Sequence, residues 1–586
     1  MNVLAEKRDS KDPQVVAFDP TKQRWRIFSH AVRILIARTS EDVLPLLEQA
    51  ETAVARDGVH AAGWISYEAA PAFDPCLPSK GTGAFPLLWL GLFQQVQEVE
   101  RLQPGSGAPL PASWMPSIDP DEYQRSLEQI HRYIRAGDTY QVNFTYRLRA
   151  QLAIDPWDLF CQMAGDGNVP YAAFVDAGDW ALCSASPELF LRLDGDRVES
   201  RPMKGTAARG RWSEEDLAQA AALRASEKNQ AENVMIADMV RNDLGRIAES
   251  GSVQVPALFA VERFPTVWQM ITTVQARTQA SVVQILQATF PPASITGAPK
   301  RRAMEIIAEL ESTPRQVYTG AIGFISPGRQ AQFNVAIRTV AVNRATGEAE
   351  YGVGGGIVWD SQPASELQEC LTKAAALHPV KRDFDLLETL LWTPGEGYWL
   401  LEYHLKRLLQ SAAYFGFAVD VAHVRAQLEA FAAALPSARH RVRLLVSPKG
   451  ACNCTGTAVD DAALRFADLP LAKEPVDARD LFLYHKTTHR MVYERAVQAC
   501  PGFKDVLLFN AQGEITESTV ANVAFELEGE LVTPPLQCGL LPGVHRAMLL
   551  ERGELRERVV TLKEARQASQ VYLLNSVRGM HPVRIV

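Results

Sequence analysis

Apolar residues along this chain recur with two different periods. Over residues 119–137 they return every three or four positions among Arg and Glu, which predicts an amphipathic helix that ends at Gly137. The same spacing predicts helices over 226–246, 301–310 and around 403–409. The apolar face of the first helix is formed by Tyr123, Leu127, Ile130 and Ile134.

Continuous or alternating apolar runs between these helices predict strands. Pro187 interrupts one run, so the neighbouring Glu188 is expected at a break in the sheet. Arg338 is expected within a strand, and Lys486 is expected to follow an aromatic one. The Pro- and Gly-rich residues 103–111 predict a loop or boundary, and the glycine-rich residues 352–356 predict another loop. The predicted strands cover 63–68, 88–93, 138–145, 183–191, 335–339 and 441–446.

Length and charge narrow the class of protein. A chain of 586 residues, 47% hydrophobic and 22% charged, is globular and is expected to form two or more domains. The formal net charge of −8 and the absence of a basic block argue against nucleic-acid binding. The N-terminal residues lack the apolar core of a secretion signal, and no uncharged apolar run is long enough for a bilayer. We therefore expect a cytoplasmic protein that does not enter membranes.

The eight cysteines do not form a pattern of their own. Only Cys452 and Cys454 are close together, and no second Cys or His pair follows at the spacing of a zinc site. Free thiols in a reducing compartment are expected.

Lys204 is the first candidate reactive group. It lies between the turn formers Pro202 and Gly205 and is followed by the hydroxyl of Thr206. Such a motif alone is usually a solvated surface turn. A lysine buried beside another cation, however, loses part of its proton affinity and can attack carbon. Glu188 alone is likewise usually a solvated carboxylate, and only a closed site would make it an acid.

Carboxylates recur on two of the predicted helices. Glu232 lies among apolar residues, where a carboxylate is unfavourable without a cation. Glu366, Glu369 and Lys373 share one helical face further along the chain. That face could be a salt-bridged surface, or the two helices together could hold an oxygen-loving ion such as Mg²⁺.

Two further segments are suited to an anion. Residues 294–300 end in a lysine at the start of a predicted helix, where free N–H groups favour carboxylate or phosphate. The glycines of 352–356 allow backbone N–H groups to approach a ligand. Arg338 could pair with a carboxylate through two hydrogen bonds. Together these residues indicate a small carboxylated substrate, a divalent metal, and a lysine and a glutamate as reacting groups.

Five motifs, found in family order, resemble the chorismate-utilising enzymes over residues 119–378. That resemblance implies two large antiparallel sheets packed together and flanked by helices, with chorismate between them. Anthranilate synthases typically carry Ala where this chain has Lys204, and a lysine there resembles the aminodeoxychorismate synthases of the family. The motifs are Ser186-Pro187-Glu188, Lys204-Gly205-Thr206, Val240-Arg241-Asn242-Asp243-Leu244-Gly245, Ile295-Thr296-Gly297-Ala298-Pro299-Lys300 and Ala336-Ile337-Arg338-Thr339.

The resemblance also implies residue roles. Lys204 would attack chorismate at C2 while Glu188 protonates the departing C4 hydroxyl, and ammonia would then add at C4 and expel the lysine. Mg²⁺ would be held by Glu232 and Glu369, with Glu366 nearby. Gln141 stands where isochorismate synthases carry a water-activating lysine. The residues implied in substrate binding are Gln141, Thr206, Thr296, Tyr318, Arg338, Gly354, Gly355, Gly356 and Lys373.

Two positions depart from the family pattern. Many members have a histidine where this chain has Gln269, close to the leaving group. The metal helix often has another acidic residue where this chain has Asn229.

The hydrophobic pattern restarts after residue 385, and residues 385–586 resemble the class IV pyridoxal-phosphate enzymes. Lys486 would form the Schiff base with pyridoxal 5′-phosphate and move protons. Glu517 would pair with the pyridine nitrogen. Arg407 and the backbone of Leu541 and Val544 would hold the phosphate, with the hydroxyl of Thr519 as a further contact. His489 replaces a common asparagine, and the usual opening strands are expected to be missing.

The sequence therefore predicts an α+β protein with two catalytic domains. Residues 1–380 would form the chorismate-utilising domain, with an N-terminal part at 1–105 and a catalytic core at 119–378. Residues 385–586 would be a lyase that releases p-aminobenzoate and pyruvate. The alternatives are an amino acid aminotransferase or a non-catalytic module in the second domain, and an anthranilate-type synthase in the first.

Partners also follow from the motifs. No Gly-x-Cys-x-Gly glutaminase motif occurs, so ammonia is expected from a separate glutamine amidotransferase. A homodimer through the C-terminal domain is possible.

Overall fold

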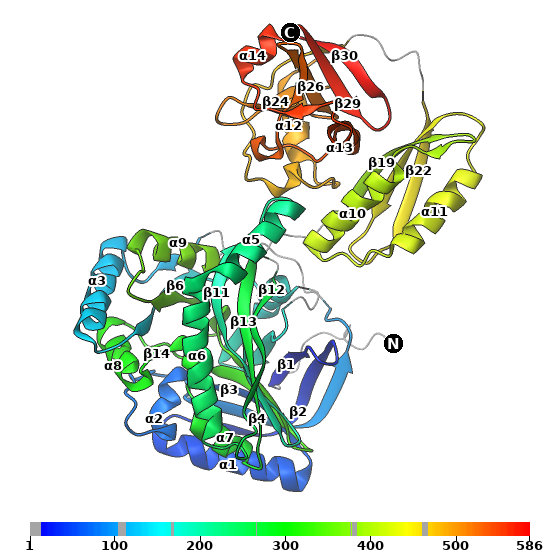
Figure 1. Ribbon diagram of the computed structural model, residues 1–586. Coiled ribbons are helices and arrows are strands. Elements are labelled where there is room, and N and C mark those ends of the chain that lie inside the picture. Colours follow the sequence, from blue (N-terminus) through cyan, green and yellow to red (C-terminus); the bar gives the residue numbers. More distant parts are fainter. Residues whose placement is uncertain are drawn as a thin grey trace. The chain divides into compact units, whose positions relative to one another are not determined.

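The computed structural model describes residues 13–103, 110, 113–165, 169–264, 266–374, 377, 384–459 and 467–586. These residues separate into two compact units, each with its own core (Figure 1). The first unit contains residues up to 208 and 220–380, and the second contains 209–219 and 381–586. The units are separated in the sequence between residues 380 and 381, except that one short segment from before this point belongs to the second unit.

The strands of the first unit form one continuous antiparallel network. Its hydrogen-bonded order runs β6–β18–β17–β8–β7–β1–β2–β4–β3–β15–β16–β9–β10–β13, with β5 and β14 beside β6 and with β11 and β12 beside β13. The strands are β1 (Gln14–Asp19), β2 (Arg24–Ala37), β3 (His60–Ile65), β4 (Leu88–Val99), β5 (Met115–Pro116), β6 (Gln141–Gln151), β7 (Ala173–Asp176), β8 (Trp180–Ser184), β9 (Leu189–Asp194), β10 (Arg197–Arg201), β11 (Met203–Ala208), β12 (Gln254–Arg263), β13 (Val267–Arg277), β14 (Gly297–Ala298), β15 (Ala321–Ser326), β16 (Gln330–Val335), β17 (Thr339–Asn343) and β18 (Glu348–Ile357).

The two ends of this network meet in space. A side-chain carbon added to Gly356 of β18 would lie only 2.9 Å from Nζ of Lys204 in β11. Since β18 and β11 stand near opposite ends of the hydrogen-bonded order, the sheet must fold back on itself. The fold class expected from the sequence, an α+β protein with packed antiparallel sheets, agrees with this arrangement.

Helices cover the sheet, and those predicted over 119–137, 226–246 and 301–310 begin and end within one residue of the prediction, whereas several others were not predicted. Helix α3 has Asp119 as its N-cap and ends at Gly137, which has a φ of 81°. Apolar residues on the inner faces of α1, α3 and α7 join the buried clusters of the sheet. The helices of this unit are α1 (Ser40–Asp57), α2 (Ala70–Phe73), α3 (Pro120–Ala136), α4 (Pro156–Ala164), α6 (Glu227–Gly245), α7 (Val282–Thr289), α8 (Lys300–Leu310) and α9 (Pro363–Ala374), while α5 (Ser213–Ala225) begins in the segment that belongs to the second unit.

The second unit contains a four-stranded sheet, a six-stranded sheet and a two-stranded pair. The four-stranded sheet, ordered β20–β19–β21–β22, packs α10 and α11 against one core. The six-stranded sheet is ordered β23–β30–β29–β26–β27–β28, and β24 pairs with β25. The elements are β19 (Leu386–Thr393), β20 (Gly397–Tyr398), α10 (Leu401–Phe415), α11 (Val421–Ala433), β21 (His440–Val446), β22 (Cys452–Ala458), β23 (Ala467–Leu469), α12 (Met491–Ala499), β24 (Leu507–Phe509), β25 (Ile515–Ser518), β26 (Asn522–Leu527), β27 (Glu530–Thr533), α13 (Val544–Glu551), β28 (Arg556–Glu557), α14 (Leu562–Gln567), β29 (Gln570–Asn575) and β30 (Gly579–Ile585).

Three local predictions were wrong. The glycine-rich residues 352–356 are part of strand β18 rather than a loop. Arg338 lies between β16 and β17 with a φ of 50°, in the left-handed region, and not within a strand. Lys486 follows a short 3₁₀ helix, Leu481–Leu483, and not an aromatic strand. Most of the predicted loop at 103–111 lies outside the described residues.

The remaining global expectations concern thiols and membranes. All eight cysteines are free, as the sequence predicts. Within the described parts of the chain, no helix combines the length and apolar character that a bilayer crossing requires.

Candidate active sites

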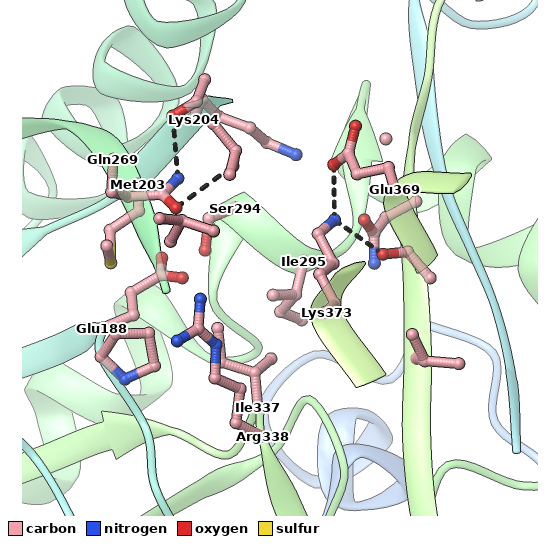
Figure 2. A pocket seen from close by; sticks show the side chains of 18 of the residues that line it. Glu188, Met203, Lys204, Gln269, Ser294, Ile295, Ile337, Arg338, Glu369 and Lys373 are labelled. Carbon is pink, nitrogen blue, oxygen red and sulfur yellow. Dashed lines mark hydrogen bonds and ion pairs between the residues drawn. The ribbon is translucent and has the colours of Figure 1, made fainter. Parts of the chain in front are cut away.

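A cavity of about 180 Å³ lies in the first unit, lined by most of the residues for which the resemblance implies a catalytic, substrate-binding or metal-binding role. Figure 2 shows Glu188, Lys204, Arg338 and Lys373 approaching it from separate elements. Lys204 extends from β11, and Glu188 sits at the break between β8 and β9. Residues far apart in sequence therefore surround one space.

Lys204 is held at a bulge in the register of β11 against β13. Its carbonyl accepts from Asn233, while Gln269 binds the carbonyl of Gly205 and the hydroxyl of Thr206. No hydrogen bond joins its Nζ to any residue that the structure describes. Burial lowers the pKa of Lys204, and the positive charge of Lys373 lowers it further while Glu232 opposes the change. The amine is thus directed into the cavity and is easier to deprotonate than a free lysine.

Glu188 is 3% exposed, and it has the opposite electrostatic character. Burial raises its pKa to about 7, although Ser294 and the charge of Lys204 act against the rise. A carboxyl with a pKa near neutrality can donate a proton to a leaving group and take it back. One cavity is therefore lined by an amine with a lowered pKa, Lys204, and a carboxyl with a raised pKa, Glu188.

The positive groups of the cavity could receive carboxylates. Burial lowers the pKa of Arg338, which lies on the cavity wall. The ring of Tyr318 packs where a side chain at Gly352 would stand, since a carbon added there would lie 2.2 Å from the ring. Lys373 donates to the carbonyl of Gly354 at 2.8 Å. A carboxylated substrate would thus meet Arg338, Tyr318 and Lys373.

Gln141 lies just behind the cavity wall, close to Lys204. It is 1% exposed, and within the described structure neither its amide nitrogen nor its amide oxygen has a hydrogen-bond partner. A carbon added to Gly356 would lie 2.0 Å from this nitrogen, so only glycine leaves room for it. Its unsatisfied amide suits a small polar group arriving between Gln141 and Lys204.

Three carboxylates line the same cavity, those of Glu232, Glu366 and Glu369, and their chemistry indicates whether Mg²⁺ would fit. Burial raises the pKa values of Glu232 and Glu366, and Glu369 raises both further by repulsion. A divalent cation would relieve that repulsion, and oxygen ligands are those that Mg²⁺ prefers. Within the described residues, no three acidic, His or Cys groups are already gathered as a metal site. The residues therefore fit the ion chemically, but Glu369 must first leave Lys373, which lies 2.7 Å away.

Some predicted contacts are absent from the cavity wall. Thr296 is completely buried behind it, and its hydroxyl donates to the carbonyl of Ala293. Ser294 and Ile295 line the cavity instead. Gly355 faces the acidic helix, with an added carbon 3.2 Å from Oε2 of Glu366 and 3.8 Å from Nζ of Lys373.

Sequence reasoning missed several lining residues. Lys228 on α6 and Asn143 on β6 face the cavity together with Met203, Tyr351 and Thr372. Lys228 stands four residues before Glu232, a spacing that would have placed both on one helical face.

Lys486 in the second unit lies among charged groups, and these groups test the fit of a pyridoxal cofactor. Burial lowers its pKa to about 8, and Arg407 contributes to the decrease. Burial raises the pKa of Glu517 to about 7. Glu517 accepts from Tyr493 at 2.8 Å and from Asn522 at 3.1 Å. A buried amine and a fixed carboxyl of this kind fit the two ends of the cofactor ring.

Arg407 is positioned by a buried ion network. It donates twice to Glu388, at 2.9 and 2.5 Å, and once to the carbonyl of Pro542 at 3.1 Å. His404 contacts Glu388 through Nδ1 at 2.6 Å, while its buried Nε2 has no partner within the described residues. Burial would raise the pKa of Glu388, yet Arg407 and His404 hold it at about 2. The guanidinium of Arg407 is thus fixed in a network in which Nε2 of His404 is left for a polar ligand.

Two predicted phosphate contacts have other partners. The amide of Leu541 donates to Glu517, and its carbonyl accepts from Asn522. The hydroxyl of Thr519 donates to Asp505 at 2.6 Å. Val544 remains at the first turn of α13. Sequence reasoning missed Glu388, His404, Tyr493 and Asn522, although His404 lies one helical turn before Arg407.

The antiparallel strands of the first unit thus surround a cavity lined by Lys204, Glu188 and several further charged groups. Residues 12–379 match the family model described as chorismate binding enzyme, and the chain belongs to that family. Residues 385–586 match the model for class IV aminotransferases. The chain thus carries a chorismate-binding domain followed by a class IV aminotransferase domain.

Individual relatives support the first assignment. The chain is 40% identical over 279 residues to aminodeoxychorismate synthase component 1 of Escherichia coli, covering 47% of this chain and 61% of that protein. It is 44% identical over 262 residues to aminodeoxychorismate synthase of Streptomyces griseus, covering 44% and 36%. The matches therefore span less than two thirds of these relatives. Anthranilate synthase component I from Streptococcus pneumoniae shares the fold, with a TM-score of 0.53, 25% identity and coverage of 64% and 94%.

Proposed function

We propose that this chain makes p-aminobenzoate in two steps, the first in its chorismate-binding domain. Chorismate and ammonia would give 4-amino-4-deoxychorismate and water there. The second domain would then release pyruvate and form the aromatic ring. One observation supports the first step best. An amine without a hydrogen-bond partner in the described structure, Lys204, and a carboxyl with a pKa of about 7, Glu188, line the same cavity.

The first step consists of two successive substitutions on the ring of chorismate. Nζ of Lys204 bonds to C2 while the C4 hydroxyl takes the proton of Glu188 and leaves as water. Ammonia then forms the C4–N bond as the bond between C2 and Nζ breaks, and the new C4 ammonium returns one proton to Glu188. Gln141 lies where it can bind and orient the incoming ammonia, because its amide has no partner in the described structure.

Carboxylate recognition and metal binding share one wall. Arg338, Tyr318 and Lys373 would hold the substrate carboxylates. Glu232, Glu366 and Glu369 would hold Mg²⁺, which supplies positive charge for the ring carboxylate. The backbone of Gly354 and Gly356 allows the substrate to approach closely, since neither has a side chain.

Ammonia would come from a separate glutamine amidotransferase. The E. coli relative is named component 1 of its enzyme, which supports a second component here. Free ammonium at high concentration would replace that partner in an assay.

In the second step, Lys486 would hold pyridoxal 5′-phosphate until the substrate amine replaces it. When bound, the cofactor supplies an electron sink for the carbon that carries the amine. The freed amine of Lys486 would remove the C4 proton as the enolpyruvyl group leaves. Glu517 would keep the pyridine nitrogen protonated, and Arg407 with the amide of Val544 would bind the phosphate.

The decisive experiment incubates the purified chain with chorismate, ammonium and Mg²⁺, with and without pyridoxal phosphate, and separates the products by chromatography. p-Aminobenzoate and pyruvate that require the cofactor would support both steps. Aminodeoxychorismate that accumulates despite the cofactor would leave the second domain with another amine substrate or no catalytic role. Anthranilate would contradict the role given to Lys204.

Two variants assign each step to its unit. Lys204→Ala should stop formation of aminodeoxychorismate and should show whether any anthranilate activity is latent. Lys486→Ala should let aminodeoxychorismate accumulate and should prevent borohydride from trapping the cofactor on the protein. If Lys486→Ala still traps cofactor, another lysine carries it and the assignment is wrong.

A further inference from the structure

Residues 209–219 belong to the second unit although the chain places them between Lys204 and Glu232. Residues 209–216 form a compact structure through hydrogen bonds among themselves. Arg209 donates to both oxygens of Asp216 at 2.7 Å, and the amide of Gly210 donates to the same carboxylate at 2.9 Å. A side-chain carbon on Gly210 would lie 2.1 Å from the amide nitrogen of Asp216. The segment therefore has one compact conformation that needs a glycine.

Trp212 carries this segment into the core of the second unit. It is 8% exposed and packs in one apolar cluster with Val476, Leu483 and Tyr493. Its ring stacks on Tyr484, with the centroids 5.2 Å apart and the planes at 27°. Stacked aromatic pairs add favourable energy beyond their buried area. The segment is thus a part of this core rather than a strand of chain passing over it.

Arg211 contacts the residues that come immediately before Lys486. Its guanidinium donates to the hydroxyl of Tyr484 at 3.1 Å and to the carbonyl of Ala478 at 3.3 Å. Its carbonyl lies 3.1 Å from Nε2 of His485. Both residues preceding Lys486 are therefore fixed by one segment.

The contact with Arg211 also determines the tautomer of His485. A carbonyl only accepts, so Nε2 carries the hydrogen, and Nδ1 must accept from the hydroxyl of Ser411 at 3.0 Å. Burial lowers the pKa of His485 to about 4, so the ring stays neutral. Tyr414 packs on this ring at 4.4 Å and donates to the carbonyl of Gly210 at 2.8 Å. Both ring nitrogens and one face of the imidazole are therefore held by neighbouring residues.

We propose that residues 209–216 are a positioning element for Lys486, acting through Tyr484 and His485. The amine can serve the cofactor only if the backbone at 484–486 holds one direction, and the segment supplies that restraint from outside the class IV aminotransferase domain. The proposal rests on the proposed cofactor role of Lys486. The contacts of residues 209–216 with residues 484–485 exist without the cofactor, so the restraint can be tested separately from cofactor binding.

The test uses the full chain with Trp212→Ala, and Leu217→Ala as the matched control, because Leu217 lies five residues further along, in helix α5, and is 62% exposed. Hydrogen exchange of the peptide that contains 484–487 is measured without cofactor. Loss of the stacked ring should speed this exchange about tenfold. In the cofactor-loaded protein, the pH midpoint of the cofactor absorbance should shift for Trp212→Ala and stay unchanged for Leu217→Ala.

Trp212→Phe keeps an aromatic ring and should restore both readouts towards the unsubstituted chain. If Trp212→Ala does not fold, Trp212→Leu keeps volume without stacking and replaces it in the comparison. Equal exchange and equal midpoints in Trp212→Ala and Leu217→Ala would overturn the proposal. A chain that takes up no cofactor would instead contradict the proposed second step, while the exchange result would still decide whether the segment restrains 484–486.

Discussion

Nζ of Lys373 lies 2.7 Å from Oε1 of Glu369 and forms an ion pair with this carboxylate, which is the one expected to hold the metal. Lys373 lowers the pKa of Glu369, so this carboxylate is ionised and ready to bind a cation. If Glu369 binds the proposed Mg²⁺, the metal ion would compete with Lys373 for this carboxylate. Binding of Mg²⁺ would release the amine of Lys373 towards the substrate carboxylate.

Replacing Glu369 by Gln should therefore weaken Mg²⁺ binding. We expect the Mg²⁺ concentration for half-maximal chorismate turnover to rise by about 10- to 100-fold, as when the surroundings of a metal are disturbed. The measurement is a Mg²⁺ titration of initial rates, with calorimetry as a direct check. Gln368→Ala, exposed on the same helix, is the control. An unchanged titration in Glu369→Gln would remove this residue from the metal site.

Gly356→Ala should stop the first step without unfolding the protein. The added carbon would lie 2.0 Å from Gln141 and 2.9 Å from Lys204, so both reactive positions would have to move. A displacement of about 1 Å can lower a rate about 100-fold. Gly245→Ala is the control, because a carbon there meets nothing within 4 Å. Chorismate consumption and the melting temperature are measured on both variants, and equal rates would show that the glycine is not required.

Glu188 should give the first step a descending limb in its pH profile. Burial raises its pKa to about 7, and the proton it must donate is lost as the pH rises through that value. Glu188→Gln should lower the rate by about 10²- to 10⁴-fold, the range for a general acid. The limb near pH 7 should also be missing from whatever rate remains. A limb that persists in Glu188→Gln must belong to another group.

Tyr493→Phe should weaken cofactor binding in the second unit. Its hydroxyl stabilises ionised Glu517, so its loss would raise the pKa of that carboxyl and weaken its pairing with a pyridine nitrogen. We expect the dissociation constant of pyridoxal phosphate to rise about tenfold or more. Tyr403→Phe removes another Tyr–Glu hydrogen bond, an exposed one with Glu551, and should leave the affinity unchanged. Absorbance titration of both variants makes the comparison.

Glu311 should be important for stability rather than chemistry. It is 4% exposed and accepts from Thr145, Arg147 and Arg315. Glu311→Gln would leave the buried Arg315 without its carboxylate and Arg147 with only its longer pair to Glu350, which should lower the free energy of unfolding by about 3–5 kcal/mol. Glu305→Gln removes two surface pairs, with Arg301 and Arg302, and should change the free energy of unfolding by about 0.5 kcal/mol or less. Urea unfolding of both variants tests the difference.

Glu311 should also make the stability of the fold sensitive to acid. Burial would raise the pKa of Glu311, but the charge of Arg315 outweighs it and lowers the pKa below its ordinary value. The stabilisation is therefore complete above the ordinary carboxyl range and is lost as the pH falls through the folded-state pKa. Glu311→Gln should show less loss of stability on acidification than the unsubstituted chain.

Local features were predictable because local residues determine them. The stop of α3 at Gly137 follows from a glycine that adopts a φ of 81° after an amphipathic run. The break at Pro187 separates β8 from β9, where a proline cannot continue the ladder. Both features could be inferred from a few adjacent residues.

Other features depend on distant partners that a single sequence does not reveal. The glycines of β18 predict a loop, but they are needed in a strand because Gly352 lies under the ring of Tyr318 and Gly356 beside Gln141. Thr296 belongs to a recognisable motif, yet its position behind Ser294 depends on how 293–298 turns. Nothing near Trp212 indicates that its ring stacks on Tyr484, more than 250 positions away.

The grouping of residues 209–219 with 381–586 has a consequence for engineering. A fusion joined only end to end could be divided by cutting the backbone once between the two parts. Here a single cut near residue 380 would leave one fragment with an unsupported Trp212 and the other with an open core at Tyr484. Two separate genes made from this chain would therefore each need redesign before either product could stand alone.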